Sequence, residues 1–134
     1  DGDGTAVYSD PGRHEDGRFY LQGTWSTDLE SVRHGMATGE LEDYVAIRYT
    51  AASVNVVVQP EGPEDFIVVA TLNDNPIPEW DRGTDIRVNE EGSTYFLVDT
   101  PRLYSVIRSG VVNTFELELQ VDSTNFVLYT FTFG

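Results

Sequence analysis

The 134-residue chain contains no cysteine and no lysine. Without cysteine it has no disulfide framework, no thiolate nucleophile and no thiolate-bound metal, and without lysine it has no Schiff-base chemistry. No run approaches the roughly 18 to 20 apolar residues of a membrane-spanning helix. Residues 1–10 lack the basic start and apolar stretch of a signal peptide. We therefore expect a soluble domain, or one excised from a longer protein, without membrane insertion.

Sequence motifs for catalysis are absent as well. The chain has no Gly-x-Ser-x-Gly elbow, no His-Glu-x-x-His and no phosphate-binding Gly-x-x-x-x-Gly-Lys. Its two histidines, His14 and His34, lie in glycine-rich or polar stretches, so we expect both to be solvated loop residues. Carboxylates are numerous, but their spacing singles out no acid pair for glycoside hydrolysis. These absences predict a protein that is not an enzyme and needs no cofactor.

The charge is strongly one-sided. The chain has 23 acidic residues against 8 basic ones, all of them arginine, and a net charge of −15. Such a surface repels nucleic acid and anionic lipid. It also favours solubility, and it is compatible with a location outside the cell or in salty water.

Apolar residues alternate with polar ones along most of the chain, with turn residues between the alternating runs. In residues 114–121, for example, Phe115 and Leu117 fall on one face and Glu116 and Glu118 on the other. No stretch keeps a helical apolar period for three turns. This pattern predicts an all-β sandwich of two antiparallel sheets, with one face of each strand in the core. The expected strands are Phe19–Trp25, Tyr44–Ala51, Val54–Val58, Phe66–Leu72, Ile86–Val88, Tyr95–Val98, Leu103–Ile107, Thr114–Val121 and Phe126–Phe133.

Turn signals and composition set the expected boundaries. Residues 1–17 are rich in glycine and polar residues, so we expect a lead-in or linker segment followed by one β-sandwich domain over residues 18–134. A bulge or bend is expected at residues 51–53, between two closely spaced strands. Ser109 and Gly110 predict a turn.

Aromatic side chains are the remaining chemical resource. Trp25 is in phase with the apolar residues of its strand, so we expect it in the core. Trp80 instead lies in a polar loop, where its ring could form a flat platform for a sugar while neighbouring side chains hydrogen-bond the hydroxyls. The candidate ligand-binding residues are Trp80, Asp81, Arg82 and Asp85. A tryptophan packed as a plug over the end of the sandwich is the alternative.

Two acidic stretches were considered as calcium sites. Residues 1–12 begin like a calcium loop, but position 12 is glycine where an EF-hand needs a bidentate glutamate. The second stretch contains Glu79, Asp81, Asp85, Glu90 and Glu91. We interpret it as a solvated loop whose charge is answered by Arg82 and Arg87, and we predict no metal site.

Five short motifs follow one another along the chain. They are Leu21-x-Gly23-x-Trp25, Ala51-x-x-Val54-Asn55-x-Val57, Arg82-Gly83-x-Asp85, Pro101-Arg102-Leu103-Tyr104 and Tyr129-x-Phe131-Thr132-Phe133-Gly134. In order and approximate spacing they resemble the C-terminal domain of DipZ-type thioredoxin-like proteins. The resemblance implies a jelly-roll sandwich similar to carbohydrate-binding modules. It also implies a non-catalytic partner of a redox-active thioredoxin domain on the extracytoplasmic side of a bacterial membrane (periplasmic, cell-surface or secreted).

The chain departs from that full architecture because it has no Cys-x-x-Cys, so redox activity does not carry over to these residues. In the matched motifs, Gly23 and Gly83 suit backbone constraint, while Arg82 or Arg102 could bridge carboxylates at the ends of the sandwich. Three functions are considered, and the missing histidine, cysteine and lysine chemistry disfavours the third, an enzyme. Of the first two, one is a binding module for a glycan or another polymer. The other is an interaction domain that docks onto a thioredoxin-like domain or another protein subunit by a surface patch or an edge strand.

Overall fold

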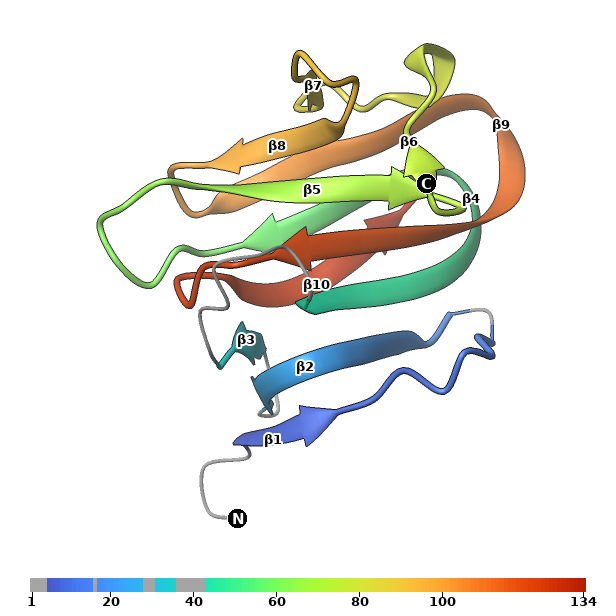
Figure 1. Cartoon of the computed structure of the whole chain (residues 1–134). Helices are drawn as coiled ribbons and strands as arrows, with labels where there is room; N and C mark the ends of the chain where they lie inside the picture. The colour runs from blue at the N-terminus through green and yellow to red at the C-terminus, as the bar shows by residue number, and fades with distance from the viewer. Residues whose placement is uncertain (1–4, 16, 28–30, 36–42) are drawn as a thin grey trace.

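The computed structural model describes residues 5–15, 17–27, 31–35 and 43–134. Within these ranges the predicted all-β fold is confirmed: ten strands form one sheet whose pairings are antiparallel (Figure 1). The strands are β1 Thr5–Tyr8, β2 Phe19–Thr27, β3 Val32–His34, β4 Asp43–Val58, β5 Phe66–Leu72, β6 Asn75–Pro76, β7 Arg87–Val88, β8 Thr94–Val98, β9 Arg102–Val121 and β10 Val127–Phe133. A 3-10 turn, η1, spans Glu79–Asp81. Within the described ranges, no helix has the length and apolarity to cross a bilayer.

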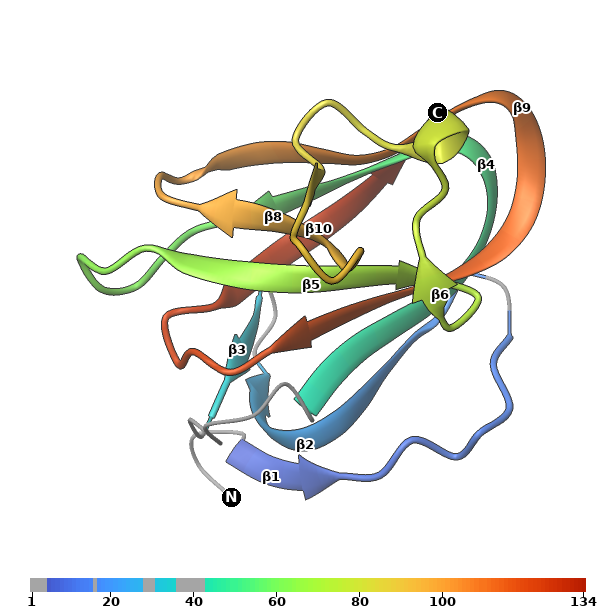
Figure 2. The ribbon, with the colours of Figure 1, turned by 45° about the horizontal axis from the view of Figure 1, so that its top comes forward.

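Two long strands, β4 and β9, form the backbone of the sheet. They pair along their whole length, from Asp43 opposite Val121 to Val58 opposite Arg102. The free edge of β4 carries β2 along its first part and β10 along its second part. Figures 1 and 2 show both long strands bending sharply, so that the sheet turns back on itself and encloses the core. The predicted bulge in β4 is confirmed by a register shift between Ala51 and Ser53.

The predicted turn at Ser109 and Gly110 is wrong, because β9 runs through these residues as one strand. Residues 109–112 lie between Arg108, which faces Ser53, and Asn113, which faces Ala51. They therefore form the outer side of the bend rather than a hairpin. Continued pairing with β4 on both sides of the bend overrides the local turn signal.

The bend divides the sheet into two parts. We call β8, β5, residues 113–121 of β9, residues 43–51 of β4, β2 and β1 the front half, because these strands follow one another from top to bottom in Figure 1. Residues 102–108 of β9, residues 53–58 of β4, β10 and β3 form the rear half. Side chains from both halves meet in a single buried cluster, which includes Leu21, Val45, Val56, Phe96, Tyr104 and Leu119. Trp25 is completely buried in it, as the sequence predicts.

The segment predicted as a lead-in, residues 1–17, contains β1. This strand pairs with β2 from Thr5 opposite Ser26 to Tyr8 opposite Gly23. After β1 the chain returns to the sheet at Gly17, whose backbone N–H donates to the Arg48 carbonyl at 2.7 Å. The described part of this segment therefore contributes a strand to the sheet.

Candidate functional site

Hydrogen bonds of Arg82 and Gly83 anchor the loop around Trp80 to β9 and to Ile77. The Arg82 Nε donates to the Ile77 carbonyl at 2.9 Å, and Arg82 also forms a β-bridge with Ile107 of β9. The Gly83 N–H donates to the Val106 carbonyl at 2.8 Å. A Cβ on Gly83 would lie 2.3 Å from the Ser105 carbonyl oxygen, so only glycine lets the loop approach β9 this closely. Although the loop is anchored, the side chain of Trp80 is 77% exposed.

The other predicted ligand residues are engaged within the protein. Asp81 is buried. The Asp85 carboxylate accepts two hydrogen bonds from the Arg102 guanidinium, at 2.8 and 3.1 Å, and a third from the Ser105 N–H at 2.7 Å. The bonds from Arg102 hold the pKa of Asp85 below its usual range.

Arg102 is therefore the direct partner of Asp85, and the charge of Arg87, which the sequence predicts as a partner of this acidic loop, also lowers the pKa of Asp85. The Arg102 guanidinium also lies 3.9 Å from the ring centroid of Tyr104, close enough for a cation–π contact. A carboxylate bridge by Arg102 was one of the sequence-based options. Of the four predicted ligand residues, Trp80 presents an open aromatic ring, and its ligand-binding role stays a prediction.

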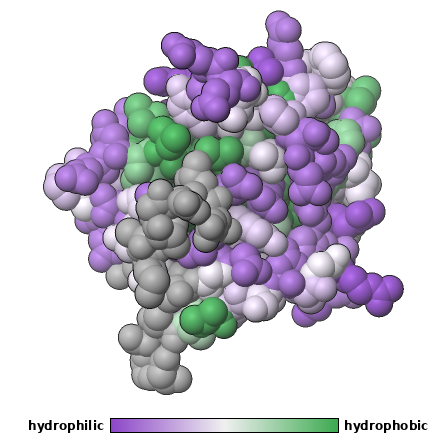
Figure 3. Space-filling model, viewed as in Figure 1, coloured by the Kyte–Doolittle hydropathy of each residue, from purple (hydrophilic) through white to green (hydrophobic). Residues whose placement is uncertain are grey.

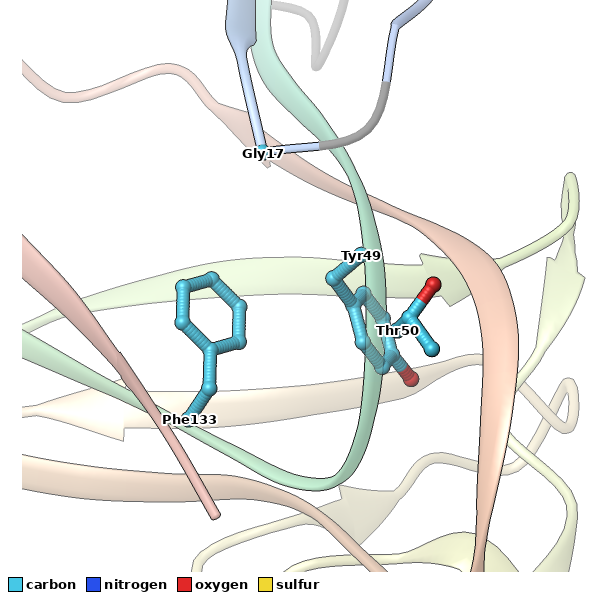
Figure 4. A pocket seen from close by; sticks show the side chains of 4 residues that line it. All are labelled: Gly17, Tyr49, Thr50 and Phe133. Carbon is cyan, nitrogen blue, oxygen red and sulfur yellow. The ribbon is translucent and has the colours of Figure 1, made fainter.

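A pocket of about 300 Å³ lies where β10 ends beside β4, lined by Gly17, Tyr49, Thr50 and Phe133 (Figure 4). Phe133 faces buried Val54 across the ladder, so its ring belongs to the inner side of the sheet, yet it is 45% exposed. Its ring stacks on those of Tyr49 and Phe131, with centroids 6.1 and 6.4 Å apart. The pocket therefore lies at the edge of the core, with Phe133 at its exposed side and the buried Tyr49 at its inner side.

Tyr49 forms the inner wall of this pocket. Its side chain is almost fully buried, and its hydroxyl has no hydrogen-bond partner within the described ranges. Burial raises the pKa of the phenol, and the charge of Asp81 raises it further. Sequence reasoning missed the pocket, because Phe131 and Phe133 have the spacing of ordinary core residues in a terminal strand.

A polar cluster lies on the outer side of the front half, where His14 reaches across from the segment between β1 and β2. Its ring stacks on Tyr20 with centroids 4.2 Å apart, and its side chain is only 8% exposed. The Nε2 contacts Asp10 Oδ1 at 2.6 Å and the Nδ1 contacts the Glu116 carboxylate. The prediction of a solvated loop histidine is wrong for His14, because its ring lies between a nearby carboxylate, Asp10, and one that is distant in the sequence, Glu116.

Several groups in this cluster have shifted pKa values. Burial alone would lower the pKa of His14, but hydrogen bonds and charges from Asp10 and Glu116 raise it. Burial acts against ionised Asp10, yet hydrogen bonds from Tyr44, the Gly12 N–H and His14 lower its pKa. Burial raises the pKa of Glu118. Shifted values gathered at one place are typical of functional sites, and also of structural ion-pair networks.

His34 is the second histidine that the sequence misplaces. It is 1% exposed in β3, with its ring 4.9 Å from that of Trp25. The Nε2 contacts Asp43 Oδ2 at 2.8 Å and the Nδ1 contacts the Ser123 carbonyl at 2.9 Å. Both ring nitrogens are thus engaged inside the protein, and we interpret His34 and Asp43 as a structural pair.

The acidic residues of residues 79–91 do not come together as a set of ligands. Within the described ranges, no group of three or more histidine or acidic side chains is placed to hold a metal ion.

Comparison with known proteins gives one result for the whole chain. The sequence profile of the family described as "Thioredoxin like C-terminal domain" matches residues 1–134. No curated protein matches the chain.

Proposed function

The chain belongs to the family of thioredoxin-like C-terminal domains, and we propose that it is a non-catalytic, extracytoplasmic binding module that recognises a glycan. As a member of this family it is an accessory domain of a thioredoxin-like protein. With no cysteine in the chain, dithiol chemistry has to come from another domain. This module would then bring that domain to a polymer.

The exposed indole of Trp80 is the observation that carries this proposal. Soluble proteins usually bury most of a tryptophan, whereas this ring is 77% exposed on a loop anchored to β9. A rigid exposed ring suits stacking against the C–H groups of a sugar, because little conformational entropy is lost on binding. The carboxylate of Asp85 is engaged with Arg102 and Ser105, so the exposed ring rather than its acidic neighbours carries the proposal.

The bent sheet also supports the proposal. Its front and rear halves enclose one core, and we infer that they correspond to the two sheets of a jelly-roll sandwich similar to carbohydrate-binding modules. In such an architecture the loops at the end of the sandwich are free to vary and to carry the ligand site.

Titration with soluble polysaccharide fragments tests the glycan proposal through tryptophan fluorescence. We expect the emission of Trp80 to shift on binding, with a dissociation constant on the order of 0.1 to 1 mM, since one stacked ring and a few hydrogen bonds on an open surface bind weakly. Trp80→Ala should abolish the shift, and Trp80→Phe should retain part of the affinity when binding is followed by calorimetry.

The buried Trp25 serves as an internal reference, because its emission should stay unchanged by ligand. A broad screen of glycans that leaves the Trp80 emission unchanged would contradict the proposed ligand. So would a glycan that binds wild type and Trp80→Ala equally well.

A second candidate function is docking onto a thioredoxin-like domain. It is favoured by Val111 and Val112, which are 63% and 65% exposed side by side on the outer bend of β9. We infer that these adjacent exposed apolar residues on a strongly acidic surface contribute to a protein contact.

For this function we expect a thioredoxin-like domain added in solution to shift the amide NMR signals of residues 109–112. The Val111→Ser, Val112→Ser double variant should lose those shifts and keep glycan binding. Unchanged binding in the double variant would place the docking surface elsewhere, with the edge strands β1 and β7 as the next surfaces to test.

A further inference from the structure

The segment between β1 and β2 lies against the outer side of the front half through side-chain contacts. The Asp10 N–H donates to Gln22 Oε1 at 2.9 Å, and the Tyr44 hydroxyl donates to Asp10 Oδ2 at 2.6 Å. The Glu15 N–H donates to the Tyr20 hydroxyl at 2.9 Å. Backbone hydrogen bonds to the sheet resume at Gly17, just before β2, so these side-chain contacts decide whether residues 9–15 stay on the sheet.

His14 joins the most distant parts of this arrangement. One ring nitrogen contacts Asp10 on its own segment, and the other contacts Glu116 on β9, which is two strands away from β2. The face of the ring covers Tyr20. A protonated imidazole can donate from both nitrogens at once, whereas a neutral one can donate from only one and must accept with the other. A carboxylate cannot donate, so both contacts are hydrogen bonds only when the ring is charged.

The surroundings supply more negative than positive charge. The titratable and charged side chains of the sheet beneath the segment come from three strands and one turn. They are Tyr20 of β2, Tyr44 and Arg48 of β4, Glu116 and Glu118 of β9, and Asp74 in the turn after β5. In the segment itself are Asp10, Arg13 and Glu15, and Glu15 pairs with exposed Arg18. Arg48 faces Glu116 across the ladder, and its own interactions leave it engaged within the protein. Figure 3 shows mainly hydrophilic side chains on this side of the molecule.

We propose that His14 is a proton-operated clasp, which in its charged form holds residues 9–15 over Tyr20 and Tyr44 and which loosens as the pH rises. The clasp is a conformational device separate from the Trp80 loop and independent of what that loop binds. Its effect would be to cover or uncover a strip of tyrosine, carboxylate and amide groups on the front half.

The direction of the pH dependence follows from the two partners. Because the pKa of His14 is raised, the stability that His14 gives to the closed segment is fully present below the pKa of a free histidine, near 6.5. This stability is lost as the pH rises through the raised pKa. Because the pKa of Asp10 is lowered, the stability that Asp10 gives to the closed segment is lost only when the pH falls through that lowered pKa, which lies below the pKa of a free aspartate. The clasp is therefore closed between these two limits and opens on the alkaline side.

Two measurements on the 134-residue chain test the clasp. NMR titration of the two histidines should give a midpoint for His14 above 6.5, and Glu116→Gln should move this midpoint downward. Amide hydrogen exchange, corrected for the intrinsic effect of pH, should give lower protection factors for residues 10, 12 and 15 at pH 8.5 than at pH 5.5. We expect the decrease to be about threefold or larger.

Two variants separate the clasp from ordinary packing. His14→Gln should lower the protection of these amides at pH 5.5 and remove its pH dependence. Arg18→Gln, which breaks an exposed ion pair of the same segment, should leave both unchanged. A His14 midpoint at or below 6.5, or the same loss of protection with pH in His14→Gln as in wild type, would overturn the proposal.

Discussion

Replacement of Gly23 by alanine should lower the free energy of unfolding by about 3 to 5 kcal/mol, through backbone strain and overpacking together. Gly23 has a φ of +104°, which an L side chain adopts only with strain. A Cβ at this position would also lie 2.0 Å from the Cγ of Asp43, far inside van der Waals contact. Both effects act in the folded state, so urea denaturation should show a lower midpoint.

Asp43 has little freedom to move out of the way. Its carboxylate contacts buried His34, which in turn contacts the Ser123 carbonyl. Moving Asp43 would leave a buried ring nitrogen without a partner, which costs roughly 1 to 3 kcal/mol by itself. The clash is therefore with a fixed group and not with the flexible end of an exposed side chain.

Two other glycines provide matched controls. Gly92 also has a positive φ, +86°, but a Cβ there meets nothing within 4 Å, so Gly92→Ala should show the strain alone, about 1 kcal/mol. Gly110→Ala has neither strain nor clash and should change stability by less than about 0.5 kcal/mol. If Gly23→Ala is no more destabilising than Gly92→Ala, the close packing of Asp43 on β2 is wrong.

Trp25→Ala is the second substitution for which we expect a large loss, about 3 to 5 kcal/mol of unfolding free energy. The indole is fully buried, and its N–H donates to the Gln22 carbonyl at 2.7 Å. It packs edge-on against Phe126, at a centroid distance of 5.9 Å, and against His34. Removal of the ring leaves a cavity between β2, His34 of β3 and Phe126, the residue before β10. Thermal unfolding followed by circular dichroism would measure the loss of stability.

Trp80→Ala removes the same side chain from an exposed position. The expected change is below about 0.5 kcal/mol, because the exposed ring loses little contact with the protein. A loss of several kcal/mol in Trp80→Ala would mean that the ring is a plug over the end of the core. The sugar-platform interpretation would then fail even if the chain binds a glycan.

Much of the fold could be predicted from residue periodicity. Alternation predicts β2 and the second part of β9, and it places Trp25 inside, because side chains of a strand point alternately to core and solvent, while β5 is recognised as a continuous apolar run. Periodicity carries no information about where a strand bends while it stays paired. For that reason the sequence predicts a turn at Ser109, where local turn propensity competes with a ladder to β4 that only the folded chain contains.

The candidate sites were harder to predict for a related reason. Trp80 could be recognised because it interrupts a polar loop, which is a local signal. The cluster around His14 depends on Glu116, which is 102 residues away in the sequence. Likewise, Asp85 meets its partner Arg102 only because the loop after η1 runs along β9. Such pairs become visible only after the strand order is known.

The continuous pairing of β4 with β9 also bears on how the chain folds in time. Both strands pass through the front and the rear half, so each half needs contacts between distant segments: Asp43 with Val121 in the front half, and Val58 with Arg102 in the rear half. Closing such long loops costs entropy before the contacts repay it, and proteins of this kind fold in milliseconds to seconds. The two halves should therefore appear together in a single slow step, with no half-formed domain accumulating before it.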